Sequence, residues 1–242
     1  MMKKAFTLAE VLITLGIIGV VVAITMPTLI QRFREKETVS KLQKAYSAIS
    51  QAYEYALAEN GTPDNWGLVS FSQNDETDEK NILYHLKPYL KLTEYCGTKQ
   101  FACWNNTKAI TGITFEHESS KYYSKAILSD GTAILSIVTH QGCTGNSDGV
   151  KNICGLIRVD LNGKKPPNIM GRDVFSFHVT KNKIIPTGTP LETKTRNSSF
   201  ENGCIGEAGG RGCTAWVLYN ENMDFLHCPE KLGWDKAKSC KQ

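Results

Sequence analysis

The sequence begins MMKKAFTLAEVLITLGIIGVVVAITMPTLI (residues 1–30), and the interpretation of the whole chain depends on these residues. Two lysines precede an apolar run from Phe6 to Met26, and that run contains one ionisable side chain, Glu10. The run matches the roughly 20 residues that a membrane-spanning helix needs. A carboxylate inside such a helix costs roughly 2.5–3.5 kcal/mol, so we expect Glu10 to have a specific role.

Three ordinary interpretations of this stretch each leave a feature unexplained. A cleaved secretory signal peptide has a short apolar centre and a small-residue cleavage site, whereas this centre is long, contains Glu10, and is not followed by a clean Ala-x-Ala. An uncleaved signal anchor matches the length but gives Glu10 no role. A buried core helix fits least, because no other element flanks the run.

The residues Lys3-Lys4-Ala5-Phe6-Thr7-Leu8-Ala9-Glu10 resemble the prepilin cleavage and methylation motif of type IV pilins and type II secretion pseudopilins. The resemblance implies that a prepilin peptidase cuts between Ala5 and Phe6 and then methylates the amine of Phe6. Glu10 becomes the fifth residue of the mature chain, which is the family's position for its carboxylate. Ala5 stands where that family more often has Gly, and Ala9 where it more often has Ile.

The resemblance also gives Glu10 a partner. The freed amine of Phe6 is a cation with a pKa of about 8, and it can pair with Glu10 of a neighbouring subunit, because a low dielectric favours the pair over two separate charges. The implied partners are homologous pilin subunits, a prepilin peptidase, the inner-membrane assembly platform and, before assembly, the membrane. The implied location is the inner membrane, crossed once with the C-terminus outside the cytoplasm, and then a periplasmic or cell-surface filament.

A helix is expected to continue beyond the apolar run. We expect a helix break at Gly19 and Pro27, where the first helix segment kinks or ends, because proline removes a backbone donor and clashes with the preceding turn. By the same resemblance, Gly19–Pro27 matches a stretch that looks partly melted in assembled type IV filaments. Apolar residues then recur at three- and four-residue steps as far as Asn60-Gly61-Thr62-Pro63, a strong stop signal. One helix from Phe6 to Ala58 would be about 80 Å long.

The remaining sequence predicts antiparallel strands, with a hairpin signal at Ser129-Asp130-Gly131. The expected strands cover 122–128, 132–139, 156–161, 174–180, 183–185 and 216–219, and a short helix interrupted near Pro88 covers 81–92. The expected fold is α+β and pilin-like: a long N-terminal helix packed on an antiparallel sheet, with a disulfide-stapled C-terminal region. The expected parts are a leader (1–5), a transmembrane or filament-core helix (6–27), its amphipathic continuation (28–60) and an extracytoplasmic globular domain (61–242).

All eight cysteines lie beyond residue 95. An even number confined to one part of the chain favours disulfides in an oxidising compartment. Zinc is the alternative, but structural zinc sites favour cysteines separated by about two to four residues, and the closest pair here has six residues between. Pairing of neighbours closes the shortest loops and is the pairing that we expect. The expected pairs are Cys96–Cys103, Cys143–Cys154, Cys204–Cys213 and Cys228–Cys240.

The segment 159–175 is similar to a D-x-N-G-x-x-x-P-N-x-x-G-x-D-x-F stretch of some pilin-like proteins. Asp160, Asn162 and Asp173 are candidate oxygen ligands for calcium, as in a loop of type II major pseudopilins. Lys164 and Lys165 bring opposing charge. We therefore favour the alternative, a turn in which Asp and Asn side chains bind their own backbone.

Composition and motifs narrow the function further. The 242 residues carry a net charge of +4 without a long basic block, so nothing argues for nucleic-acid binding. No GxSxG, HExxH, P-loop or GxGxxG in a strand context is present, and we expect neither an enzyme nor a cofactor. The expected function is a structural pilin or pseudopilin subunit. The alternative is an extracytoplasmic binding domain held by an uncleaved signal anchor.

Overall fold

The computed structural model describes residues 7–115, 118, 120–147, 149–192, 197–207 and 209–241. The expected cleavage and methylation residues, Ala5 and Phe6, lie outside the described residues. The chain divides into two compact units, with the boundary between Glu37 and Thr38. This boundary lies within the first helix and beyond Pro27, and each unit is described by itself.

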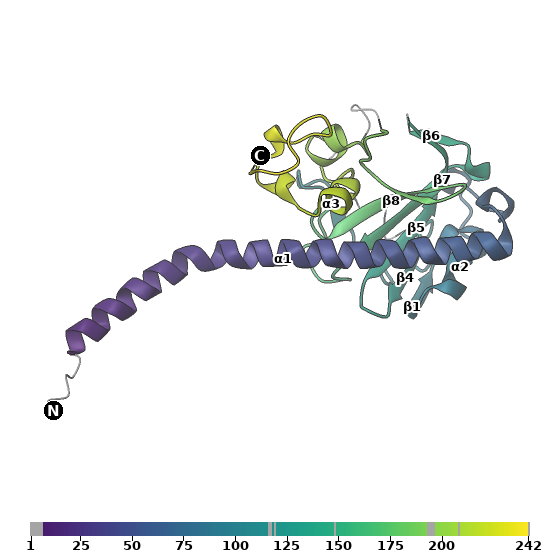
Figure 1. The fold of residues 1–242 in the computed structure, drawn as a ribbon. Helices are drawn as coiled ribbons and strands as arrows, with labels where there is room; N and C mark the ends of the chain where they lie inside the picture. The colour runs from purple at the N-terminus through teal and green to yellow at the C-terminus, as the bar shows by residue number, and fades with distance from the viewer. Residues whose placement is uncertain are drawn as a thin grey trace. The chain divides into compact units, whose positions relative to one another are not determined.

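Helix α1 extends from Leu8 to Asn60 with Pro27 inside it (Figure 1). The helix therefore does not end at Gly19 or Pro27. Pro27 removes one backbone donor, and Gly19 costs about 1 kcal/mol of helix propensity relative to alanine. The turns on both sides of these positions are nevertheless helical. Loosening in an assembled filament remains a prediction.

The part of α1 beyond Thr38 packs one face against a β-sheet (Figure 1). Its buried residues follow three- and four-residue steps, which confirms the amphipathic pattern for this part of the helix. Tyr46, next to this face, stacks on Phe177 of the sheet, with the ring centroids 5.5 Å apart. The buried helix residues are Val39, Leu42, Ala45, Ile49, Ala52, Tyr53 and Ala56.

The sheet contains seven antiparallel strands within the described part of the chain, in the order β1-β4-β5-β7-β8-β9, with β6 paired to β7. The expected hairpin is confirmed as β4 and β5, and the strands expected at 174–180 and 183–185 are present as the paired strands β8 and β9. Gly131 adopts φ +89°, which the turn between β4 and β5 requires. The strands are β1 Leu92–Gly97, β4 Ser124–Leu128, β5 Ala133–Val138, β6 Gly145–Ser147, β7 Val150–Asp160, β8 Val174–Thr180 and β9 Ile184–Pro186, and a separate pair comprises β2 Thr107–Lys108 and β3 Thr114–Phe115.

Helix α2 (Ile82–Leu86) is followed by a 3₁₀ turn at Lys87–Tyr89. The expected short helix is therefore interrupted near Pro88, as predicted. The expected strand at 216–219 is wrong, because α3 (Thr214–Asn220) occupies this region. Thr214 Oγ1 accepts a hydrogen bond from the backbone of β8, and the ring of Trp216 stacks on Phe200 at 4.0 Å. A short apolar run is compatible with either a helix or a strand, and here these tertiary contacts hold a helix.

Short 3₁₀ and π turns and four disulfides complete the second unit. The disulfides join Cys96 to Cys103, Cys143 to Cys154, Cys204 to Cys213 and Cys228 to Cys240, which confirms the expected neighbour pairing. The α+β arrangement with disulfides in the distal region is likewise confirmed. The other 3₁₀ turns are Pro63–Asn65, Phe71–Gln73, Asp78–Lys80, Gln141–Cys143, Asp224–Leu226 and Pro229–Lys231, and Phe200–Cys204 forms a π turn.

Strands β7 and β8 have two chemically different faces. Ile157 and Phe177, which are paired across the two strands, belong to the same core as the buried face of α1. Successive side chains point to opposite faces of a sheet, so the neighbouring pair Arg158 and Ser176 lies on the other face. The face of β7 and β8 that does not contact α1 therefore carries polar side chains alongside apolar ones such as Val174, and the segment after β9 packs on it.

Candidate functional site

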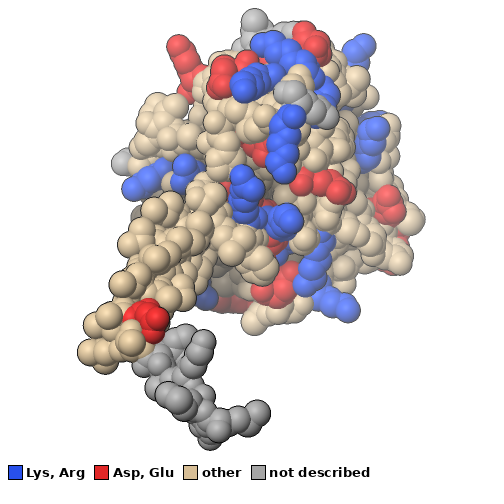
Figure 2. Space-filling model, turned by 60° about the vertical axis from the view of Figure 1, so that its left-hand side comes forward, with Lys and Arg blue, Asp and Glu red and all other residues tan. Residues whose placement is uncertain are grey.

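In the first unit, the apolar side chains of α1 are exposed. Leu12, Ile17 and Ile24 are 61%, 61% and 70% exposed. By length and composition the helix is able to cross a membrane, a property that membrane anchors and signal sequences share. Figure 2 shows an uncharged surface along this part of the helix, with acidic atoms near its beginning. Contiguous exposed apolar surfaces typically mark sites of membrane or protein interaction.

The acidic side chain at the start of α1 is Glu10, and its carboxylate is bound to Thr7. Oε2 of Glu10 accepts hydrogen bonds of 2.8 Å from the backbone N and from Oγ1 of Thr7, and the backbone N of Glu10 donates to Thr7 Oγ1 at 3.3 Å. This reciprocal arrangement is a capping box. Both residues are exposed, and among the described residues no cation forms an ion pair with Glu10.

The structure brings the three candidate calcium ligands together in the loop between β7 and β8. Asp173 accepts hydrogen bonds from the backbone N of Asn168 (2.9 Å) and Ile169 (2.6 Å), and from Nδ2 of Asn162 (3.0 Å). Because both carboxylate oxygens of Asp173 already accept donors from the loop itself, the arrangement fits the favoured turn better than a calcium site.

Asp160 is the buried member of this group, with 1% of its surface exposed. Burial, and then the charge of Asp173, raise the pKa of Asp160 to about 8. Oδ1 accepts the backbone N of Asn162 at 3.3 Å, and the side-chain nitrogen of Asn168, in the orientation that satisfies both ends of its amide, donates to Oδ2 at 3.0 Å. A proton on Asp160 relieves the repulsion between the two carboxylates.

A polar cavity of about 430 Å³, which sequence reasoning missed, lies on the face of β7 and β8 that does not contact α1. Its charged and aromatic members are Arg158, His178 and Arg211, and Leu156 forms an apolar part of its wall. Ser147, Ser176 and Ser198 contribute hydroxyl groups. These residues come from β6, β7, β8 and the segment between β9 and α3, so the sheet and one long connection build the cavity together.

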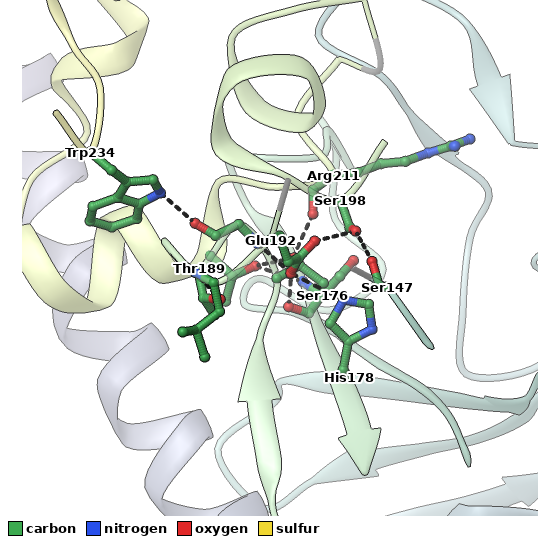
Figure 3. Close-up of polar contacts among 12 residues, drawn as sticks. Ser147, Ser176, His178, Thr189, Glu192, Ser198, Arg211 and Trp234 are labelled. Carbon is green, nitrogen blue, oxygen red and sulfur yellow. Dashed lines mark hydrogen bonds and ion pairs between the residues drawn. The ribbon is translucent and has the colours of Figure 1, made fainter. Parts of the chain in front are cut away.

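One wall of the polar cavity is a chain of hydrogen-bonded side chains (Figure 3). His178 Nε2 lies 3.2 Å from Oε1 of the buried Glu192, and Ser198 Oγ donates to Oε2 of the same carboxylate. Ser147 Oγ lies 3.3 Å from Ser198 Oγ. In a Ser-His-acid relay the histidine contacts the serine, whereas here the carboxylate lies between His178 and Ser198. The arrangement therefore fixes side chains in place and differs from that of an acyl-transfer site.

The other wall of the polar cavity contains two guanidinium groups. Arg158 forms an ion pair with the buried Glu118, which also accepts hydrogen bonds from Trp104 Nε1 (3.2 Å) and the backbone N of Thr107 (3.3 Å). Burial, and then the nearby Arg211, lower the pKa of Arg158 to about 9, while its pairing with Glu118 acts in the opposite direction. Arg158 therefore remains a cation at neutral pH and faces a second cation.

One signal in the sequence points to this cavity. Arg158 interrupts an apolar strand, and Ser176 and His178 alternate with apolar residues in the next strand. Such alternation indicates a polar face of a sheet. It does not show that residues near 198 and 211 cover this face, because no local pattern specifies that packing.

Comparison with family models gives a match. No curated protein and no solved structure matches the chain. A family model described as a family of unknown function (DUF6613) matches residues 28–197. The matched region extends from the amphipathic part of α1 through the whole sheet, and Arg211 lies beyond it. Because the match spans more than half of its length, the chain belongs to the family of unknown function DUF6613.

Proposed function

We propose that the protein is a structural subunit, a pilin or pseudopilin, of a type IV pilus or a type II secretion-like filament. In this proposal a prepilin peptidase removes residues 1–5 and methylates the new amine of Phe6. Before assembly the subunit is anchored in the inner membrane, with its globular unit outside the cytoplasm. It is then incorporated into the filament by packing of the apolar part of α1.

The observation that carries the proposal is the exposed apolar surface of α1 with a single carboxylate near its start. The part of the helix beyond Thr38 is covered by the sheet, but Leu12, Ile17 and Ile24 have no cover in the subunit. Lipid covers such a surface before assembly, and the same surfaces of neighbouring subunits cover it afterwards. One helix then serves as a temporary anchor and as the core of a filament.

Glu10 supports the proposal because a single carboxylate in an apolar helix needs a cationic partner. Its own subunit provides Thr7 as a hydrogen-bond donor, which neutralises no charge. The amine of Phe6 from an adjacent subunit would supply the missing cation, and the pair would also fix the axial register between the two helices.

The mature N-terminus of the native protein tests this function. Intact mass measurement and N-terminal sequencing should find a chain that begins at N-methyl-Phe6. An intact Met1, or a cut beyond Ala23, would overturn the proposal. An intact Met1 would instead support an extracytoplasmic binding domain on an uncleaved anchor, a second function that the polar cavity favours.

A further inference from the structure

The polar cavity contains four polar side-chain atoms that have no hydrogen-bond partner within the described structure. They are Nε of Arg158, Nε of Arg211, Oγ of Ser176 and Nδ1 of His178, and all four side chains line the cavity. Ser176 and His178 are only 4% and 6% exposed. Each unpaired buried polar group costs about 1–3 kcal/mol, so four such atoms around one cavity call for a polar partner inside it.

We propose that the polar cavity binds a small hydroxylated carboxylate, of which a sugar acid is the simplest example. Its volume of about 430 Å³ is that of a small-molecule site. Guanidinium groups present N–H donors in a planar fork that matches a carboxylate. Serine hydroxyls and an imidazole nitrogen suit the hydroxyl groups of the ligand, and Leu156 offers an apolar contact for its carbon skeleton.

The arginines are held in place before any ligand arrives. The guanidinium carbons of Arg211 and Arg158 lie 4.4 Å and 5.9 Å from the centroid of the Phe115 ring, so one aromatic ring contacts both groups. Glu118 fixes Arg158 through its terminal nitrogen and leaves Nε free for another partner. Two neighbouring cations repel each other, and a bound anion would reduce this repulsion.

The charges around the polar cavity favour a carboxylate over a phosphate. Two buried carboxylates belong to the surroundings of the cavity: Glu118 pairs with Arg158, and Glu192 lies beside His178. Their two negative charges formally balance the two arginines, so the site has no surplus positive charge for a doubly charged phosphate. A singly charged carboxylate needs less compensating positive charge. The hydroxyl groups on the rest of the ligand match Ser147, Ser176 and Ser198. This inference does not depend on filament assembly, because every residue that carries it belongs to the second unit.

Calorimetric titration of the full-length protein in detergent tests the ligand class. The probes are sodium glucuronate, glucose and inorganic phosphate. Glucuronate should bind, and glucose, which lacks the carboxylate, should bind at least roughly tenfold more weakly, as expected for loss of a charge-assisted hydrogen bond. Equal affinity for glucose, no binding of glucuronate, or tighter binding of phosphate would overturn the proposal.

Two variants and a matched control locate the binding. Arg211→Gln should weaken glucuronate binding by roughly tenfold or more, whereas Arg172→Gln, at an exposed arginine of the same unit, should not. Ser176→Ala removes a hydroxyl that has no partner in the described structure, so it should leave the melting temperature unchanged while binding weakens. Wild-type affinity in both Arg211→Gln and Ser176→Ala would contradict the assignment.

A second pair of probes identifies the source of the carboxylate. Methyl β-glucuronide carries the same acid with its anomeric hydroxyl blocked, as at the end of a glycan. Binding of the glucuronide as tight as that of glucuronate supports a glycan-terminal acid. Binding restricted to free glucuronate supports a soluble sugar acid. Either result agrees with the proposal, and binding of neither compound overturns it.

Discussion

The hydroxyl of Tyr53 in α1 donates a hydrogen bond of 2.5 Å to the backbone carbonyl of Thr180, the last residue of β8. Tyr53 is 1% exposed, and burial raises the pKa of its hydroxyl further above its already high ordinary value. The hydroxyl therefore stays protonated at any physiological pH and remains a donor. This contact ties the buried face of α1 to the end of β8.

Replacing Tyr53 by phenylalanine should lower the free energy of unfolding by about 1–2 kcal/mol, because the carbonyl of Thr180 loses a buried donor. The measurement is urea denaturation followed by tryptophan fluorescence. The matched control is Tyr55→Phe on the same helix, since Tyr55 is 62% exposed and should change stability by less than about 0.5 kcal/mol. Equal effects of the two substitutions would contradict a special role for the Tyr53 contact.

Much of the fold could be predicted because its signals are local. The turn at Asp130-Gly131 and the steps of Leu42, Ala45 and Ile49 along the helix each specify their own structure. One prediction failed where distant residues decide: the 216–219 run is helical because β8 and Phe200 hold it. Helix α1 continues through Pro27 for a local reason, since the neighbouring turns remain helical on both sides.

The candidate sites also differ in whether neighbouring or distant residues build them. Asp160, Asn162 and Asp173 lie close together in sequence, and the structure brings them into one loop, as predicted. The polar cavity could not be predicted, because Ser147, Arg158, His178, Ser198 and Arg211 meet only after the sheet and the segment before α3 have folded. The pairing of Arg158 with Glu118 is likewise invisible in the sequence, since a loop and a strand supply the two charges.

The loop that holds Asp160 should make stability depend on pH. The folded pKa of Asp160, about 8, lies above its unfolded value of about 4. Between these values the folded state binds a proton that the unfolded state does not, so the free energy of unfolding should fall as pH rises from about 4 to about 8. Burial raises the pKa of Asp173 as well, in the same direction.

Asp160→Asn should flatten this dependence, because the amide keeps the shape of the protonated acid without a titratable proton. Thermal unfolding between pH 4 and 8 measures the slope, and Glu230→Gln, at an exposed site, should retain the wild-type slope. Added calcium chloride should leave the melting temperature unchanged, since Asp173 is already bound by loop donors. A calcium-dependent rise that Asp160→Asn abolishes would favour a calcium site over the turn.

The disulfide between Cys204 and Cys213 should contribute substantially to stability. It closes a short loop beside α3, and both cysteines are buried. Replacing both with alanine should lower the free energy of unfolding by about 2–3 kcal/mol, chiefly because the unfolded chain gains freedom. Since the bond itself carries the effect, Cys204→Ala alone should cost a similar amount in denaturant titrations. A double variant as stable as the wild type would show that the bond contributes little.

The role of Glu10 can be separated from processing by a single substitution. Glu10→Val should leave leader cleavage largely intact, because the cut falls on the other side of Phe6, but it should strongly reduce incorporation into filaments. Without the carboxylate, the amine of the incoming subunit has no partner in the apolar core, and an unpaired charge there is unfavourable. Mass measurement reports cleavage, and the sheared filament fraction, compared with the membrane fraction, reports assembly. Glu54→Val, at an exposed position of the same helix, is the control and should assemble normally. Filament yield from Glu10→Val equal to that of the control would refute the pairing of Glu10 with the amine, even if the mature chain begins at Phe6.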